Sequence, residues 1–156
     1  MRVTNVFGND AMKNADGGGM SRRDTINRII LENYPDVQAI YIFGSHDTED
    51  EWPDSDIDIG LLFPPSGAKE MSPLALSSCR AILADYMRKD VDLVNLRQVS
   101  TVFQKEIIAT GRLLYCASQY AVDEFEMLVM SYYQKLNQER RELLDAFMET
   151  GRAYRI

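Results

Sequence analysis

Two aspartates separated by one residue follow a polar loop near the middle of the chain. Asp56 and Asp58 open an apolar run that extends to Phe63, and a shorter apolar run, Ala39 to Phe43, precedes the loop. Both runs are rich in β-forming residues and are predicted to be strands. Because side chains alternate between the two faces of a strand, the two aspartates share one face, about 7 Å apart along it.

Two carboxylates on one face at the end of a strand repel each other unless a cation or a proton lies between them. Mg²⁺ is the natural partner, because a hard divalent cation takes oxygen ligands. We therefore predict that Asp56 and Asp58 are metal ligands. An Asp-x-Asp pair is weak evidence by itself in an acidic chain, so the prediction depends on the surrounding residues.

The Gly44-Ser45 pair ends the first predicted strand and is separated from Asp56 by ten residues. A glycine at a strand end lets the backbone approach a ligand closely. Successive N–H groups in such a turn, together with the serine hydroxyl, can hold phosphate oxygens. Phosphate binding on one side of the loop and metal-binding acids on the other predict a site for a nucleoside triphosphate.

A third carboxylate, Asp92, lies within another short apolar run, Val91 to Leu96. A carboxylate inside a packed sheet is costly unless it is paired or binds a metal. Three convergent acids are what two-metal nucleotidyl transfer requires. Asp92 is therefore predicted to be a metal ligand and the general base for the attacking hydroxyl. Asp90 is an alternative, because it lies on the same face of the strand.

Together these residues resemble a known motif. Gly44-Ser45, the ten-residue gap, Asp56-Ile57-Asp58 and the later Asp92 look like the minimal nucleotidyltransferases of the DNA polymerase β superfamily. The part after Asp92, with a helix, Gly111, a short strand and a long last helix, is similar to the MntA-type antitoxins. The resemblance covers roughly Asp24 to Met148. It implies an α+β fold in which helices flank a short mixed β-sheet and a long C-terminal helix follows.

The resemblance also implies an activity and a partner. In MntA-type antitoxins the partner is a HEPN-domain toxin, a ribonuclease, and the antitoxin silences it by transferring AMP from ATP to a tyrosine. This chain is then expected to be a Mg²⁺-dependent protein adenylyltransferase with ATP as its substrate. Asp56, Asp58 and Asp92 would hold two Mg²⁺ ions, and Gly44 and Ser45 would bind the nucleotide phosphates.

Two other functions remain open. A nucleotidyltransferase that acts on a small molecule, such as an aminoglycoside, usually needs a further acceptor-binding domain, for which 156 residues leave little room. A binding module without catalysis would sequester the toxin through its C-terminal helix. The presence of all three acids argues against that second alternative.

The loop between the two motif halves departs from the family pattern. Thr48 and Glu49 occupy places where family members often carry Arg and Gly. An acid there is expected to repel the triphosphate and to weaken ATP binding. His46 is interpreted as a polar loop residue and Trp52 as a residue that packs the loop.

Composition narrows the class of protein. The chain has 24 acids against 17 bases and a formal charge of −7, which argues against direct nucleic-acid binding because that needs a basic face. The same charge favours a basic protein partner. Cys79 and Cys116 have no metal or redox spacing, so we predict buried, reduced thiols in a cytoplasmic protein. No apolar run approaches the ~20 residues of a membrane span, and no signal segment is visible.

The motifs fall within a domain predicted over residues 21–117, preceded by a flexible leader at 1–20 and followed by a helical extension at 118–156. Ser21 or Asp24 is expected to cap the first helix, Pro35 to end it, and Gly111 to be the C′ residue of the last helix within the domain. Two further helices are predicted over 72–87 and 98–110, and the strands over 39–43, 56–63, 91–96 and 112–116.

The last predicted helix is unusually long. No proline or glycine occurs from Ser118 to Thr150, and apolar residues repeat at alternating spacings of three and four. A helix of ~32 residues would be ~48 Å long, which is longer than a domain of this size can cover. Either the helix breaks and folds back, or part of it packs against another chain and serves to dock a partner.

Overall fold

The computed structural model describes residues 20–44 and 56–150. The expectations for the leader at 1–19, for Ser45 and the loop that follows it, and for the C-terminal end at 151–156 lie outside the described residues. The expectations for His46, Thr48, Glu49 and Trp52 therefore also lie outside the described residues.

The centre of the molecule is a four-stranded mixed sheet in the order β3-β2-β1-β4. The strands are β1 (Ala39–Phe43), β2 (Ile57–Leu62), β3 (Val91–Asn95) and β4 (Arg112–Cys116). β1 is antiparallel to β2 and to β4, and β2 is parallel to β3. The predicted mixed sheet is thus confirmed, and each predicted strand agrees with the observed one to within one residue at either end.

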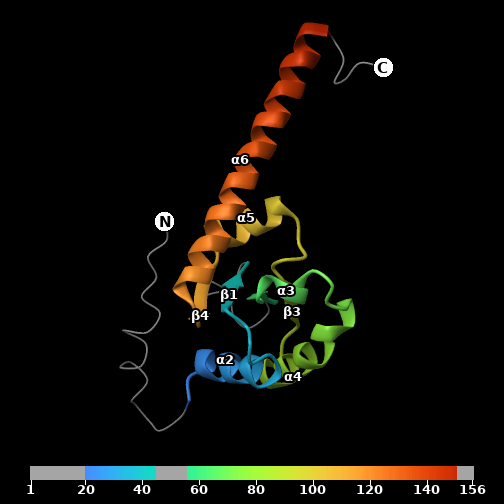
Figure 1. Ribbon diagram of the computed structural model, residues 1–156. Helices are drawn as coiled ribbons and strands as arrows, with labels where there is room; N and C mark the ends of the chain where they lie inside the picture. Colours follow the sequence, from blue (N-terminus) through green and yellow to red (C-terminus); the bar gives the residue numbers. More distant parts are fainter. Residues whose placement is uncertain (1–19, 45–55, 151–156) are drawn as a thin grey trace.

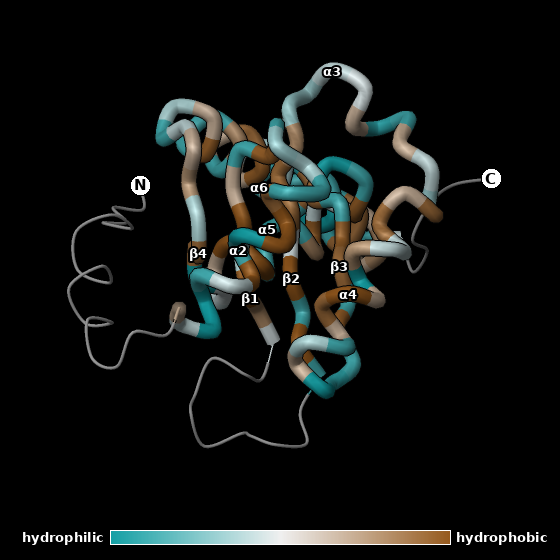
Figure 2. Tube along the Cα trace, turned by 90° about the horizontal axis from the view of Figure 1, so that it is seen from below, coloured by the Kyte–Doolittle hydropathy of each residue, from teal (hydrophilic) through white to brown (hydrophobic). Residues whose placement is uncertain are grey.

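Helices cover both faces of this sheet (Figure 1). α2 (Arg22–Asn33) and α4 (Ser77–Met87) lie against one face, and α5 (Thr101–Thr110) and α6 (Gln119–Thr150) lie against the other. Two short pieces, α3 (Pro65–Ala68) and the 3-10 turn η3 (Pro73–Leu76), connect β2 to α4. Figure 2 shows that hydrophobic residues concentrate along the strands in the middle. The predicted α+β class with flanking helices is confirmed.

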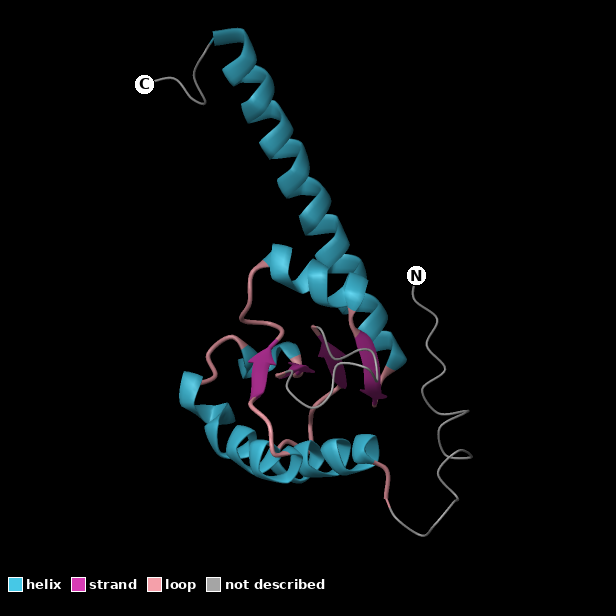
Figure 3. Ribbon diagram, turned by 180° about the vertical axis from the view of Figure 1, so that it is seen from behind, coloured by secondary structure: helices cyan, strands magenta, loops and turns pink. Residues whose placement is uncertain are grey.

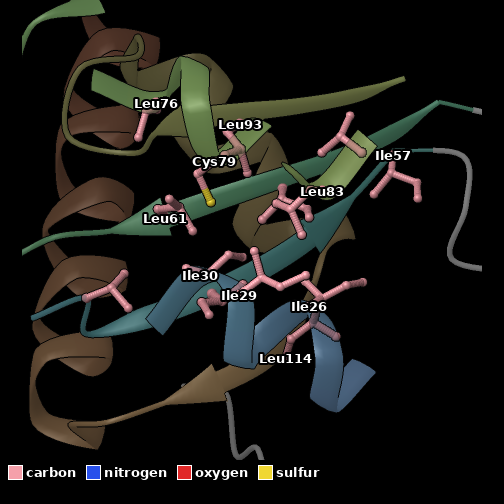
Figure 4. Close-up of a cluster of buried hydrophobic side chains, with 14 of the residues drawn as sticks. Ile26, Ile29, Ile30, Ile57, Leu61, Leu76, Cys79, Leu83, Leu93 and Leu114 are labelled. Atoms are coloured by element: carbon pink, nitrogen blue, oxygen red, sulfur yellow. The ribbon is translucent and has the colours of Figure 1, made fainter. Parts of the chain in front are cut away.

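One hydrophobic cluster joins α2 and α4 to the sheet (Figure 4). It contains three residues of α2 at i, i+3, i+4 spacing and the alternate residues of β2 that point to this face; these members are Ile26, Ile29, Ile30, Ile57, Ile59 and Leu61. α2 begins where it was predicted to begin, because the Ser21 side chain accepts a hydrogen bond from the Asp24 amide at 3.0 Å. It ends at Asn33, before Pro35.

The two later helices begin after their predicted starts. The helix predicted over 72–87 is a 3-10 turn that leads into α4 at Ser77. The helix predicted over 98–110 begins only at Thr101, because the chain first makes a turn in which the Asn95 side chain accepts from the Arg97 amide at 2.9 Å. Ser100 then caps α5 by accepting from the Phe103 amide at 3.2 Å.

Gly111 follows α5 as predicted, but its conformation is not that of a typical C′ glycine. Its φ is −81°, outside the left-handed region. Glycine is needed here instead because a larger residue would not fit. A Cβ at this position would lie 2.5 Å from the carbonyl oxygen of Ile107 and 3.0 Å from that of Ile42.

Replacing Gly111 with alanine should therefore destabilise the fold. The two obstructing atoms belong to the backbone of α5 and β1 and cannot move without distorting those elements, so we expect a loss of about 2 kcal/mol in the free energy of unfolding. Urea unfolding followed by circular dichroism measures this loss. Ala109→Ser, an exposed change two residues earlier, is the control, and equal midpoints for the two variants would contradict the prediction.

Cys79 and Cys116 are both buried and free of disulfide bonds, as predicted. Burial raises the pKa of the Cys79 thiol from 9.0 to about 11 and also raises the pKa of Cys116. In the unfolded chain these thiols ionise at a lower pH than in the folded protein. The neutral thiols therefore make their full contribution to stability below pH 9, and the contribution of Cys79 is lost as the pH rises through 11.

Iodoacetamide at pH 8 should consequently label neither cysteine in the native protein, because the thiolate is the reactive form and burial removes both charge and access. Unfolding in urea should expose both thiols to labelling, which mass spectrometry counts. Rapid labelling of the native chain would contradict the burial of these side chains.

The C-terminal helix α6 is continuous over 32 residues, so the alternative in which it breaks and folds back is wrong for this structure. Its buried residues, Ala121, Val122, Phe125 and Val129, all lie in the N-terminal part of the helix. Beyond them the helix projects away from the sheet (Figure 3). Despite its length, neither α6 nor any other helix in the described ranges is apolar enough to cross a membrane.

Candidate functional site

The strand register places two of the predicted acids side by side. Asp58 of β2 is the pairing partner of Asp92 of β3, and on its other side it is the partner of Phe43 of β1. Ile57, which precedes Asp58, and Leu93, which follows Asp92, belong to the hydrophobic cluster under α2 and α4. Because side chains alternate along a strand, Asp58 and Asp92 both lie on the opposite face, the one covered by α5 and α6.

Gly44 ends β1 next to these acids. It has a φ of +84°, and a Cβ added to it would lie 2.5 Å from Oδ2 of Asp58. Only glycine adopts this conformation at low cost, and only glycine lets the backbone lie this close to the carboxylate. The structure thus brings together three of the predicted site residues, Gly44, Asp58 and Asp92. Ser45 lies outside the described residues.

Asp56 and Asp90 stand just before their strands. The amide of Ile57 donates to the carbonyl oxygen of Asp90 at 3.0 Å, so the two strands begin side by side. Asp56 and Asp90 are both exposed. Asp90 was the alternative to Asp92, and the direct pairing of Asp92 with Asp58 favours Asp92.

The surroundings of Asp92 differ from those predicted. β3 is an edge strand, so the Asp92 side chain is 59% exposed rather than enclosed in a packed sheet. Arg80, on α4, reaches round this edge: its Nη2 lies 3.5 Å from Oδ1 of Asp92 and donates to the carbonyl oxygen of Leu93 at 3.1 Å. An exposed ion pair adds little stability, but it places the Arg80 guanidinium beside the Asp92 carboxylate.

Sequence reasoning missed Arg80 and Phe103. Arg80 lies within the helix predicted over 72–87, and no local sequence pattern shows that its side chain reaches the edge of the sheet. Phe103 lies within the helix predicted over 98–110, where no role was predicted for it. Its ring packs edge-on against Phe43, with centroids 5.6 Å apart, and stays 38% exposed. An aromatic surface therefore borders the acids on the β1 side.

A protein-family model described as "Polymerase beta, Nucleotidyltransferase" matches residues 25–120. The chain belongs to this nucleotidyltransferase family. The match spans the sheet, most of α2 and the whole of α4 and α5, and it includes every residue of the candidate site.

Among curated proteins, the chain is 33% identical over 123 residues to the protein adenylyltransferase MntA of Shewanella oneidensis; the match covers 79% of this chain and 85% of that protein. Among solved structures it resembles a toxin–antitoxin crystallised with AMP-PNP, with a TM-score of 0.69, 31% identity and coverage of 82% and 99% of the two chains. It also resembles a chain in a complex of the tri-AMPylated S. oneidensis HEPN toxin with MNT antitoxin. There the TM-score is 0.65, the identity 32% and the coverage 81% and 95%.

In this nucleotidyltransferase the donor chemistry of the site suits a divalent metal. Carboxylate oxygens are preferred by Mg²⁺, and the absence of a side chain at Gly44 lets the Asp58 carboxylate lie directly against the end of β1. Within residues 20–44 and 56–150, no group of three His, Cys, Asp or Glu side chains is arranged to hold a metal ion, and Asp92 contacts Arg80. Binding by all three acids thus stays a prediction.

Proposed function

We propose that this nucleotidyltransferase is the antitoxin of a toxin–antitoxin pair and acts as a protein adenylyltransferase. It moves AMP from ATP to a tyrosine of a HEPN-family ribonuclease toxin and so neutralises the toxin. The observation that carries the proposal is the pairing of Asp58 with Asp92 beside Gly44, in a chain 33% identical to a named adenylyltransferase.

In the proposed reaction, Gly44 and Ser45 bind the phosphates of ATP through backbone N–H groups and the serine hydroxyl. Asp56, Asp58 and Asp92 would hold two Mg²⁺ ions. When bound, the metal neutralises the triphosphate and supports in-line displacement at the α-phosphate. The remaining chemistry falls to the residues of the chain itself.

Asp92 accepts the proton of the attacking tyrosine hydroxyl. The tyrosine oxygen forms a bond to the α-phosphorus while the bond between that phosphorus and the oxygen bridging to the β-phosphate breaks. Pyrophosphate leaves, and the proton held by Asp92 passes to water. The exposure of Asp92 leaves room for a protein side chain to approach it, as an acceptor tyrosine must.

Residues 21–117 then form the catalytic domain, and residues 118–156 form the extension that docks the partner. The cytoplasm is the proposed site of action, because ATP is available there and buried thiols stay reduced. A second candidate function is neutralisation by binding alone. The exposed length of α6 favours it, since that surface serves a binding module as well as an enzyme.

The test combines the purified full chain, ATP labelled at the α-phosphate, Mg²⁺ and a candidate HEPN-family partner protein. Label in the HEPN protein, lost when its acceptor tyrosine is replaced by phenylalanine, is the expected result. A tight complex without label would favour neutralisation by binding. Label found only in an added small-molecule acceptor, such as an aminoglycoside, would overturn the choice of a protein substrate.

A further inference from the structure

Arg80 of α4 contacts the candidate site from beside the sheet. α4 packs next to the edge strand β3, and the Arg80 side chain extends along that edge as far as Asp92. Its Nη2 donates to the carbonyl oxygen of Leu93 at 3.1 Å and lies 3.5 Å from Oδ1 of Asp92. A single nitrogen atom thus links the backbone of β3 to a carboxylate of the site.

The position of this guanidinium group is determined by the fold rather than by the ion pair. On α4, Cys79 and Leu83 are fully buried in the hydrophobic cluster that joins the helix to the sheet (Figure 4). Leu93, whose carbonyl oxygen accepts from Arg80, is buried in the same cluster. Because shared core contacts fix both the helix and the strand, the guanidinium group lies beside Asp92 without help from a bound ligand.

One atom of Arg80 is in an unfavourable environment. Its Nε is buried and has no hydrogen-bond partner among residues 20–44 and 56–150. A buried donor without a partner costs stability, and a catalytic role is one of the reasons for which native proteins tolerate that cost. The cost agrees with a role for Arg80 in the site beyond covering the edge of β3.

The contact with Arg80 restricts how the Asp92 carboxylate can turn. Arg80 contacts Oδ1, so the other oxygen, Oδ2, is left for a cation on the side of Asp58, the strand partner of Asp92. Without Arg80, a carboxylate that is 59% exposed would have to be ordered when a metal ion binds, at a cost in conformational entropy. Hydrogen-bonding partners of metal-binding carboxylates remove this cost in other sites.

We propose that Arg80 is a positioning residue for Asp92. It holds the carboxylate so that Asp92 and Asp58 offer oxygen ligands to the same divalent cation. This inference rests on the carboxylate site of the proposed function, and it gives Arg80 no contact with ATP or with the acceptor tyrosine.

The experiment compares Arg80→Gln with Arg28→Gln in the full chain. Arg28 is the matched control because it forms an exposed ion pair of almost the same length on α2, with its Nη1 3.6 Å from Oε1 of Glu32. Both changes remove one positive charge from a helix, and glutamine is a good helix former, so both variants should fold. Circular dichroism checks the fold, and electron paramagnetic resonance measures the binding of Mn²⁺ alone, without ATP or toxin.

We expect Arg80→Gln to raise the Kd for Mn²⁺ about tenfold, as the loss of a hydrogen-bonding partner does in other metal sites. The Mg²⁺ concentration that gives half-maximal AMP transfer should rise with it, and Arg28→Gln should match the wild type. An unchanged Kd would show that Arg80 only covers the edge of β3. A lower Kd would show that Arg80 competes with the cation for Asp92. Either result would overturn the proposal.

A double-mutant cycle with Asp92→Asn tests whether Arg80 acts through Asp92. If it does, Arg80→Gln should change the Kd for Mn²⁺ by less than about twofold in a chain that already carries Asp92→Asn, because both changes act on one carboxylate. An undiminished effect of Arg80→Gln in that background would overturn the proposal, since Arg80 would then act on another part of the protein.

Mn²⁺ binding needs no toxin, so this proposal and the proposed function can fail separately. The expected Mn²⁺ results, together with no transfer of AMP to the HEPN-family protein by the wild type, would overturn the proposed function and leave the role of Arg80 standing. Normal transfer by the wild type, with an unchanged Kd for Mn²⁺ in Arg80→Gln, would overturn the role of Arg80 alone.

Discussion

Replacing Asp56 and Asp58 together with asparagine should abolish AMP transfer while the protein stays folded. Asparagine keeps the shape of each side chain but loses the charge that would hold a metal ion and the triphosphate beside it. Loss of a fixed charge in a reacting site typically costs two to three orders of magnitude in rate, so we expect a fall of roughly a thousandfold. Labelled AMP incorporated into the toxin measures it.

Stability should change little, because Asp56 is exposed and Asp58 is half-buried at the open end of β2. The matched control is the double variant Asp36→Asn, Asp85→Asn, which removes the same charge from two exposed positions outside the site. It should transfer AMP as the wild type does. Undiminished transfer by the Asp56, Asp58 variant would reject the carboxylate site, whereas a large drop in its Tm would attribute the loss to unfolding.

The parts of the fold that follow from local patterning were predictable from the sequence. β1 and β4 are short, strongly β-forming runs bounded by glycine, alanine or polar residues, and their predicted limits match those observed. The beginning of α2 follows from a single side-chain cap at Ser21. In each case, residues close together in the sequence determine the structure.

The features that sequence reasoning missed depend on contacts between distant parts of the chain. Arg80 can contact Asp92 only because β3 is the edge strand, and no local sequence pattern predicts the order of the strands. Likewise the requirement for Gly111 comes from two carbonyl groups in different elements. The late start of α5 depends on the side chain of Asn95, which also donates to the carbonyl of Ala68 at 2.8 Å.

The candidate site was predictable to the extent that it depends on strand alternation and pairing. Asp58 and Asp92 were expected to meet because two-metal nucleotidyl transfer requires convergent acids, and the parallel pairing of β2 with β3 places them side by side. The exposure of Asp92 was not predictable, because it depends on which side of β2 the later strand joins. Under the proposed function, that exposure leaves room for a protein acceptor beside Asp92.

Replacing Gly44 with alanine should reduce AMP transfer by about a hundredfold, because misplacing a reacting group by as little as 1 Å has an effect of this size. The added Cβ would lie 2.5 Å from Oδ2 of Asp58, so the carboxylate must turn away from its place beside Asp92. The alanine also has to adopt a φ of +84°, which costs about 1–2 kcal/mol of stability. Transfer assays and urea unfolding separate the two effects.

Gly67→Ala is the matched control, because Gly67 has a φ of +80° but no atom within 4 Å of its added Cβ. Both variants impose the same backbone strain, and only the change at Gly44 obstructs Asp58. They should therefore lose similar stability, while Gly67→Ala keeps full transfer activity. Equal activity in the two variants would show that the position of Asp58 beside Gly44 does not matter to the reaction. Equal stability with a large difference in activity would tie the need for glycine at the end of β1 to the catalytic carboxylate rather than to the fold.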